Sequence, residues 1–222
     1  MQGLPLHFRD GHLFVEIDND LWLLDTGAPS SFGSQEDLTL MGEAVELEAS
    51  YLGLDAEKLS TFTGVPCAGL LGADVLGRFD HIFDVAGGTL AISKGELSHE
   101  GREVAVSEFM GIPVVSAGIS GSEYQMFFDT GAQVSYLQDD SLGDWPSAGS
   151  VNDFYPGVGP FETDTHHVPV SLNGIEFTLR CGTLPGLLGM TLMMAGAHGI
   201  IGNQILTNRI VGYFPRRRLL VL

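Results

Sequence analysis

The tetrapeptide Asp-Thr-Gly-Ala occurs twice in this 222-residue chain, at residues 25–28 and 129–132. Each copy follows an apolar run, residues 21–24 in the first case and 126–128 in the second. A buried strand that ends in a carboxylate and then turns on a glycine holds that acid in a fixed position. Two such strands in one chain suggest that their two acids meet. The repeat therefore predicts a hydrolase.

The sequence on either side of the tetrapeptide repeats as well. Before each copy, alternating apolar and polar residues around a turn predict a β-hairpin, over residues 12–24 and 112–128. After each copy, two apolar residues and a glycine precede a short helical turn and a strand, starting at residues 70 and 200. Such internal similarity predicts two homologous lobes.

The length of the chain permits one large domain or two lobes of about 100 residues each. Because of the repeat we expect two lobes, residues 1–93 with the first tetrapeptide and residues 110–222 with the second. The segment 94–109 is rich in charge and contains two glycines, so it is the expected linker. A hydrophobic content of 44% supplies apolar side chains for both cores.

Composition excludes several classes of partner. A net charge of −18 argues against nucleic acid. No apolar run reaches the roughly 18 residues that a membrane span needs, and no signal peptide is visible, so a cytoplasmic location is the default expectation. The seven histidines show no metal-ligand spacing, and we expect neither a metal nor a cofactor. Cys67 and Cys181 are expected to be small buried residues, with one bridge between the lobes as an alternative.

The order of these elements resembles the aspartic protease superfamily of pepsins and retropepsins. Each lobe is closer in size and motif to a retropepsin subunit, and residues 200–207 are similar to the end of a viral protease subunit. The single chain with two lobes resembles pepsin. The resemblance extends from the hairpin near His12 to the expected last strand, residues 219–222. It implies an all-β, bilobal pepsin-like fold, with two β-barrel-like lobes and an active-site cleft between them.

The resemblance implies that Asp25 and Asp129 are the catalytic pair of an aspartic endopeptidase. Two carboxyl groups at hydrogen-bonding distance share one proton. The ionised member would take a proton from a bound water, and the protonated member would polarise the scissile carbonyl. By the same resemblance, Thr26 and Thr130 would link the two loops across the lobe boundary.

The remaining positions of the tetrapeptide also have implied roles. Gly27 and Gly131 would let the backbone approach the carboxylates and donate to them. Pepsins often carry Ser or Thr at the next position, and its hydroxyl favours the charged carboxylate. This chain has Ala28 and Ala132, as retropepsins do, which predicts a mildly acidic optimum, less acidic than that of pepsin.

Two positions depart from the retropepsin pattern. The residue after the tetrapeptide is commonly an acid in those dimers, and an arginine follows the later glycine and pairs with it. Here the first position holds Pro29 or Gln133 and the second holds Ala73 or Asn203. A covalently linked chain has no need of an ion pair that holds subunits together, so we expect a monomer.

Residues 151–161 resemble the flap, the hairpin that covers substrate in aspartic proteases. Gly157 and Gly159 permit the positive φ angles of a hairpin tip, with Val158 at the tip and Tyr155 placed like the flap tyrosine of pepsins. An ordinary surface loop rich in glycine and proline is the alternative.

The first lobe has less room for a flap. Its expected strand pair, residues 45–52 and 59–62, is joined by a turn that is too short to cover a cleft. The flap is therefore expected on the C-terminal lobe alone, the reverse of pepsin.

Two further segments carry expectations. The apolar residues 184–194 could form a wall of the substrate pockets or pack in the core, and we favour the core slightly. The arginine run 216–218 is expected to be a solvated turn between strands.

Together these patterns predict an aspartic endopeptidase that cleaves extended peptides or proteins beneath a single flap and that could bind pepstatin-like inhibitors. A processing protease with one native substrate is a narrower version. The alternative from another class is a catalytically silent peptide-binding protein that retains the fold.

Overall fold

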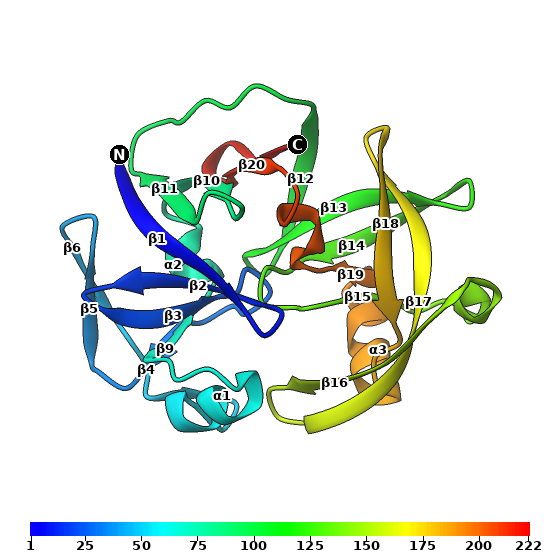
Figure 1. The fold of residues 1–222 in the computed structure, drawn as a ribbon, viewed down its shortest axis with the longest axis horizontal. Coiled ribbons are helices and arrows are strands. Elements are labelled where there is room, and N and C mark those ends of the chain that lie inside the picture. The colour runs from blue at the N-terminus through cyan, green and yellow to red at the C-terminus, as the bar shows by residue number, and fades with distance from the viewer.

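The computed structural model describes residues 1–222, apart from the side chains of Leu187 and Thr191. Strands account for 52% of the chain and helices for 14%, which confirms the predicted all-β class. We call residues 1–93 the N-terminal half and residues 103–222 the C-terminal half. Figure 1 shows most of the N-terminal half, in blue and cyan, beside most of the C-terminal half, in green to orange, while the red strand β20 lies at the top next to β10.

The N-terminal half contains β1 (Gln2–Arg9), β2 (His12–Ile17), β3 (Asp20–Leu24), β4 (Phe32–Gly33), β5 (Asp37–Leu40), β6 (Glu43–Glu46), β7 (Ser50–Tyr51), β8 (Leu54–Asp55), α1 (Ala56–Thr63), β9 (Gly69–Leu71), α2 (Ala73–Leu76), β10 (Asp80–Asp84) and β11 (Thr89–Ser93). The C-terminal half contains β12 (Glu103–Phe109), β13 (Ile112–Ile119), β14 (Ser122–Phe128), β15 (Ser135–Leu137), η1 (Asp140–Asp144), β16 (Ser147–Tyr155), β17 (Gly159–Leu172), β18 (Ile175–Gly182), α3 (Gly186–Met194), β19 (Gly199–Ile201), η2 (Asn203–Leu206), β20 (Ile210–Phe214), η3 (Pro215–Arg217) and β21 (Leu219–Val221).

The hairpin predicted before each tetrapeptide is present. In the first, β2 pairs with β3 through the turn Asp18-Asn19, and in the second β13 pairs with β14 through Ser120-Gly121. Both residues of each turn have positive φ, from 52° to 80°. Two-residue turns of this kind match the twist of the flanking strands. The short turns fix the register that delivers Leu24 and Phe128 to the start of the two tetrapeptide loops.

One sheet contains strands from both halves. Its order is β1–β11–β10–β20–β21–β12, and β10 pairs with β20 along four residues, from His81↔Tyr213 to Asp84↔Ile210. The predicted last strand therefore joins a shared sheet, at the top of Figure 1. The segment expected as a linker, 94–109, contains β12, and only residues 94–102 connect the halves without regular structure.

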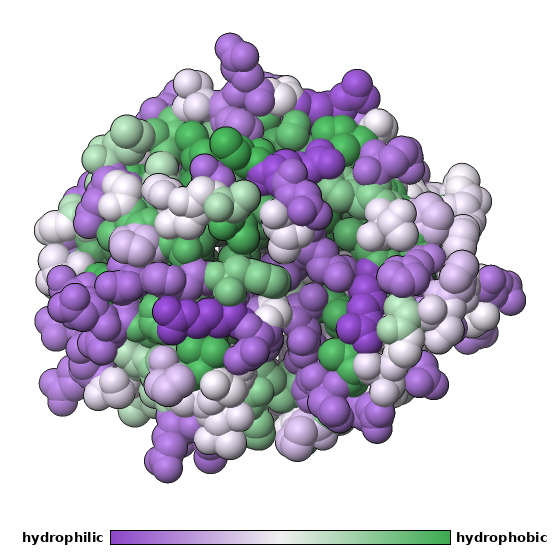
Figure 2. Space-filling model, viewed as in Figure 1, coloured by the Kyte–Doolittle hydropathy of each residue, from purple (hydrophilic) through white to green (hydrophobic). Residues whose placement is uncertain are grey.

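Three apolar clusters stabilise the fold. The largest runs through both halves and includes Phe79, Phe83, Phe128 and Tyr213. Two smaller clusters lie one in each half, around Phe14, Leu23 and Phe32 and around Tyr136, Leu184 and Ile200. Hydrophilic side chains (purple) are spread over the face drawn in Figure 2, with apolar residues (green) visible between them. Among the described residues, no helix combines the length and the apolar character of a membrane span.

The strand predicted over residues 59–62 is wrong. These residues lie in α1, which begins after Asp55 and ends at Gly64. The Asp55 carboxylate accepts a hydrogen bond from the Lys58 N–H (2.9 Å), and Gly64 has a left-handed φ of 69°. Asp55 caps the start of the helix and Gly64 caps its end. These two capping residues outweigh the β preference of the intervening Thr and Phe residues. The partner segment 45–52 instead supplies parts of two short hairpins, β5–β6 and β7–β8.

Both cysteines are free thiols, so no bridge joins the halves. Cys181 is buried as predicted, whereas Cys67 is only partly buried. Its sulfur lies 3.6 Å from the hydroxyl of Ser60.

The arginine run is an exposed turn between β20 and β21, as predicted, and two of its arginines also bind a buried carboxylate. Arg216 and Arg217 each place Nη2 on a different carboxylate oxygen of Asp80, at 2.8 and 2.7 Å. Asp80 is fully buried, and Leu97 N–H donates to it as well (2.9 Å). This carboxylate joins the end of the chain to β10 in the shared sheet.

We expect Asp80→Asn to lower the free energy of unfolding at pH 7 by about 2–3 kcal/mol, because a charged acceptor of three hydrogen bonds is removed. Burial opposes the charge of Asp80, but the Leu97 N–H and both guanidinium groups outweigh it, so the pKa of Asp80 is lowered. A lowered pKa stabilises the fold above the unfolded-state value, and the stabilisation is lost as the pH falls through the folded-state value. Urea unfolding should therefore show a smaller difference in the free energy of unfolding between the wild type and Asp80→Asn at pH 3 than at pH 7. Exposed Asp37→Asn is the control, and an equal loss in both variants would contradict the expectation.

Candidate active site

Each tetrapeptide begins where a strand ends beside a parallel neighbour. β3 runs parallel to β9, and β14 runs parallel to β19. The pairing continues into the loops, because Asp25 N–H donates to Leu71 O (3.0 Å) and Asp129 N–H donates to Ile201 O (2.9 Å). The two apolar runs that end in glycine, predicted as the second shared element, therefore hold the two aspartates in equivalent positions.

The glycines after these runs close each loop. The N–H of Gly72 donates to the hydroxyl of Ser31 (2.8 Å), and the N–H of Gly202 donates to the hydroxyl of Ser135 (3.0 Å). A Cβ on either glycine would lie within 2.7 Å of a loop carbonyl oxygen. Both serines were missed by the sequence analysis. Their signal was available, because each stands six residues after its aspartate (31 − 25 and 135 − 129).

The two loops bind each other through their threonines. Thr26 Oγ1 donates to Phe128 O (2.6 Å) and accepts from Thr130 N–H (3.1 Å). Thr130 Oγ1 donates to Leu24 O (2.8 Å) and accepts from Thr26 N–H (3.1 Å). Both side chains are fully buried. Four reciprocal hydrogen bonds thus join loops that are 104 residues apart in sequence.

Backbone donors orient the two carboxylates. One oxygen of each aspartate accepts two N–H groups from its own loop, at 2.9 and 2.8 Å in the first loop and at 2.9 and 3.2 Å in the second. The donors are Gly27 and Ala28 for Asp25, and Gly131 and Ala132 for Asp129. The other oxygen of each carboxylate accepts neither of these N–H groups.

The glycine of each loop makes room for the opposite aspartate. A Cβ on Gly27 would lie 2.4 Å from the Asp129 carboxyl carbon, and a Cβ on Gly131 would lie 2.6 Å from that of Asp25. Contacts this short are not tolerated, so an alanine at either position would force the carboxylates apart. The two acids meet because each faces a backbone without a side chain.

The pKa values of both aspartates are raised in the folded protein. Burial, the charge of Asp129 and a hydrogen bond between the carboxyl groups raise the pKa of Asp25 well above its usual range. Burial also raises the pKa of Asp129, against the hydrogen bonds from Asp25 and from the loop N–H groups. Two such carboxyl groups hold a proton between them at a pH where an isolated aspartate has lost it. The pair can therefore offer one base and one acid at once.

The second loop is bound more firmly to the opposite half than the first. His12 Nδ1 donates to Gly131 O (3.1 Å), and Asn203 Nδ2 donates both to Gly11 O (2.8 Å) and to Thr130 O of the second loop (3.4 Å). Burial lowers the pKa of His12, so the neutral ring makes this bond. Ile112 and Ala73 occupy the corresponding positions at the first loop and have no such side-chain donors.

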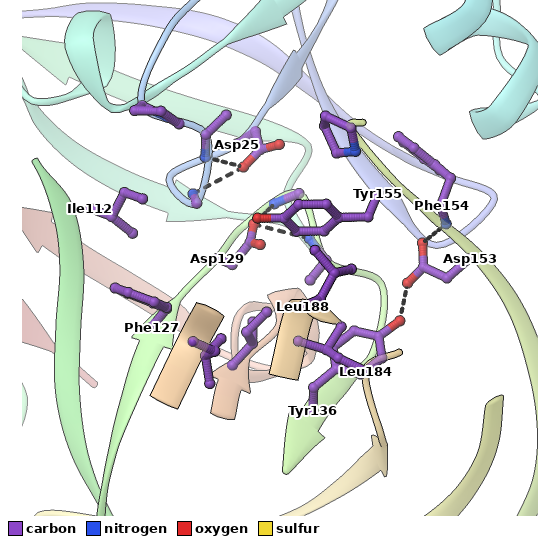
Figure 3. Close-up of a pocket in the computed structure, with 18 of the residues that line it drawn as sticks. Asp25, Ile112, Phe127, Asp129, Tyr136, Asp153, Phe154, Tyr155, Leu184 and Leu188 are labelled. Carbon is purple, nitrogen blue, oxygen red and sulfur yellow. Dashed lines mark hydrogen bonds between the residues drawn. The ribbon is translucent and has the colours of Figure 1, made fainter. Parts of the chain in front are cut away.

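A cavity of about 300 Å³ lies over the two aspartates (Figure 3). Its walls are mainly apolar and come from both halves. Leu23, Leu54 and Leu70 belong to the N-terminal half, and Phe127, Leu184, Leu188 and Ile200 belong to the C-terminal half. The segment 184–194 thus both forms part of the cavity wall and packs in the core, the two roles expected from its sequence. Leu184, Leu188 and Leu192 line the cavity, Leu184 and Leu192 are also buried in a core cluster, and Met190, Met193 and Met194 are exposed.

The segment predicted as a flap is the hairpin β16–β17, with its tip at residues 156–158. Tyr155 lines the cavity and is directed towards the aspartates in Figure 3. Tyr155 is 38% exposed, and the partial burial of its hydroxyl together with the charges of Asp129 and Asp25 raises its pKa to about 12. Gly157 and Gly159 have φ of 79° and 92°, and Val158 is exposed at the tip. Of these four predicted residues, only Tyr155 lines the cavity.

The hairpin starts in the C-terminal half and reaches the N-terminal half (Figure 1). Phe154 stacks on Phe62 of α1, with ring centroids 5.0 Å apart. A Cβ on Gly157 would contact Leu52, in the turn between β7 and β8, at 3.8 Å. The hairpin therefore covers the cavity from one side.

Several cavity residues were not predicted. Tyr51 lines the cavity from the first half, where burial and the charge of Asp25 raise its pKa. Asp153, Phe154 and Pro156 lie beside Tyr155 in the hairpin. Phe109, Met110 and Ile112 also line the cavity. Except for the stretch around Tyr155, no local pattern identifies these residues, because the packing of the two halves brings them together.

Among the described residues, no three His, Cys, Asp or Glu side chains gather in a way that could hold a metal ion. A scan against protein-family models and a search of curated proteins both found no match to this chain.

Proposed function

We propose that the protein is an aspartic endopeptidase with a bilobal pepsin-like fold. It hydrolyses peptide bonds of extended polypeptides that lie in the cavity between the N-terminal half and the C-terminal half. The observation that carries the proposal is the reciprocal geometry of the two loops. Each loop orients one carboxylate, leaves space for the other, and binds the opposite loop through a buried threonine.

The reaction proceeds by general acid–base catalysis. The ionised carboxylate takes a proton from a water that lies between Asp25 and Asp129, while the protonated carboxyl donates to the carbonyl oxygen of the scissile bond. The water oxygen bonds to the carbonyl carbon and gives a tetrahedral intermediate. The carboxyl that took the water proton then passes it to the leaving nitrogen, and the other carboxylate takes a proton back from a hydroxyl of the intermediate. The C–N bond breaks, which leaves an acid, an amine and a singly protonated pair.

The hairpin β16–β17 acts as the flap. Tyr155 contacts bound substrate above the two aspartates, and the apolar walls bind substrate side chains. Gly157 and Gly159 shape the tip, and Val158 lies on its outer side. The connection 94–102 and the shared sheet hold the lobes together in one chain, which functions as a monomer.

The proposal is tested by digestion of a peptide library between pH 3 and pH 7, with and without pepstatin. We expect cleavage with a mildly acidic maximum and inhibition by pepstatin. Pepstatin binding measured by calorimetry, together with no cleavage at any pH, would instead indicate a catalytically silent peptide-binding protein. Cleavage that pepstatin does not inhibit but a metal chelator or a serine reagent does would contradict the proposed mechanism.

The alanines of the tetrapeptides make a separate prediction about pH. Ala28→Ser and Ala132→Ser add a hydroxyl at the residue whose N–H already donates to the carboxylate of the same loop. A further donor stabilises the ionised form, so the acidic limb of the pH–kcat/KM profile should move to lower pH, by about half a unit to one unit. Ala195→Ser, also at the cavity but on the short segment after α3, is the control. An unchanged limb in both loop variants would refute the explanation.

A further inference from the structure

We infer that Asp153 selects a basic substrate side chain in the part of the cavity formed by the C-terminal half, an inference that rests on the proposed function. Asp153 lies on β16 two residues before Tyr155 and lines the cavity (Figure 3). Among the described residues, the charged side chains that line this cavity are Asp25, Asp129 and Asp153, without any Lys, Arg or His. Asp25 and Asp129 act on the scissile bond. Asp153 is therefore the remaining carboxylate in the cavity that can pair with a charged side chain of the substrate.

The surroundings of Asp153 hold its carboxylate in place. Tyr136 O–H donates to Oδ2, and the N–H of Phe154 donates to Oδ1 (2.8 Å). Tyr136 is itself buried, and burial and the charge of Asp153 raise its pKa. Each carboxylate oxygen has a second acceptor site that these two donors do not use. The ion pairs found among the described residues do not include Asp153.

The adjoining walls suit a long basic side chain. Phe161 pairs directly with Asp153 across the hairpin, and its ring lies 6.2 Å from that of Tyr136. Leu184 belongs to the same apolar cluster. Lys and Arg bury their methylene stems against apolar surface and direct the charged head to an acid, which this arrangement of three apolar walls and one carboxylate provides.

The N-terminal half does not offer the same chemistry. The residue equivalent to Tyr136 is Phe32, seven residues after Asp25 (32 − 25 and 136 − 129), and it has no hydroxyl. The cavity wall on that side includes Leu23, Leu54, Leu70 and Tyr51. One side of the cleft therefore accepts apolar side chains, while the other accepts a cationic one.

The test uses peptides that are identical except at one position, which carries Lys, norleucine or Glu, and the position is scanned along the peptide. Norleucine has an apolar stem like that of Lys without the charge. We expect one position at which kcat/KM for Lys exceeds that for norleucine on the order of tenfold, between the small effect of exposed charge pairs and the larger effect of desolvated ones. Glu at that position should be the poorest substrate.

Three variants distinguish charge recognition from a structural role. Asp153→Asn can still accept from Tyr136 and should abolish the preference for Lys over norleucine. Tyr136→Phe keeps the charge and should keep the preference. Asp164→Asn removes an exposed charge from the same hairpin, so it controls for the net charge of −18 and should leave the preference unchanged. A Lys-to-norleucine ratio that is equal in the wild type and Asp153→Asn would overturn the inference.

Binding separates this inference from the proposed function. Calorimetry with peptides whose scissile amide is replaced by a non-cleavable methylene isostere measures the same Lys-to-norleucine ratio without turnover. A preference that depends on Asp153, in a protein that cleaves no peptide, would support the inference and refute the endopeptidase. Cleavage of the peptides without any such preference would support the endopeptidase and refute the inference about Asp153.

Discussion

Replacing Asp25 or Asp129 with asparagine is expected to lower kcat/KM by on the order of 10³-fold or more, because the variant lacks one of the two groups that exchange protons with water and substrate. The substituted side chain keeps the local geometry. In Asp25→Asn, the amide oxygen can still accept from Gly27 and Ala28, and the amide nitrogen can donate to Asp129. The loss should therefore appear in the chemical step, with pepstatin binding less affected than turnover.

Asp25→Asn should also be more stable than the wild type at neutral pH. The pKa of Asp25 is raised in the folded protein, by burial first and by the charge of Asp129 second. A carboxyl with a raised pKa contributes stability that is fully present below its unfolded-state pKa and is lost as the pH rises through its folded-state pKa. Asparagine does not titrate, so the variant avoids this loss.

Thermal unfolding at pH 7 and at pH 3 is the measurement. We expect Tm of Asp25→Asn to exceed that of the wild type by a few degrees at pH 7, and the difference to disappear at pH 3. Asp37→Asn, which replaces an exposed aspartate, should show neither the loss of activity nor the gain in Tm. Turnover close to the wild-type rate in either Asp25→Asn or Asp129→Asn would exclude the proposed mechanism.

Removal of one threonine hydroxyl should produce the largest destabilisation at the site. Thr26→Ala leaves Thr130 N–H and Phe128 O without their partner, and both lie in a region where Thr26 and Thr130 are fully buried. An unsatisfied buried polar group costs about 1–3 kcal/mol, so the expected loss is about 2–5 kcal/mol. Activity should fall as well, because the two loops are no longer held in register.

A series at the same position isolates the hydroxyl. Thr26→Ser keeps both hydrogen bonds and should lose less than about 1.5 kcal/mol, since only a methyl group is removed. Thr26→Val keeps the shape and should behave like Thr26→Ala. The double variant Thr26→Ala, Thr130→Ala should lose less than the sum of the single variants, because the two hydroxyls belong to one network. Strict additivity in denaturant unfolding would show that the loops are held together by something else.

Local patterns predicted the elements that depend on neighbouring residues. The hairpins before each tetrapeptide follow from alternating apolar residues around polar turns. The first turn lies at Asp18-Asn19, one residue before the Asn19-Asp20 pair that the sequence suggested. The short helices after Gly72 and Gly202 follow from the repeated order of residues. The error at residues 59–62 was also local. Asp55 is a typical N-cap residue and Gly64 a typical C-cap residue, and this pair of signals predicts a helix such as α1 between them.

Contacts between distant segments were beyond the reach of these patterns. The arginines after β20 are exposed as expected, but no local pattern predicted that a buried carboxylate 136 residues away binds Arg216. The hairpin tip was located, but its reach over the cavity depends on the stacking of Phe154 on Phe62. Asp153 carries no distinguishing pattern of its own, and its place beside Tyr136 comes from the pairing of β16 with β17.

Three features of the site follow from the chain alone: two Asp-Thr-Gly-Ala loops exist, each follows a buried strand, and each has a glycine element downstream. These features depend on residues close in the chain, where strand period, turn geometry and glycine restrict the conformation. The interlocking of the loops, in contrast, is a product of tertiary packing, because the four threonine hydrogen bonds and the contact between the carboxyl groups join residues 104 apart. The packing of the two halves sets those distances, and with them a difference between the repeated loops. His12 binds the second loop directly, and Asn203 binds both Gly11 and Thr130, whereas Ile112 and Ala73 at the corresponding positions of the first loop have no side-chain donor.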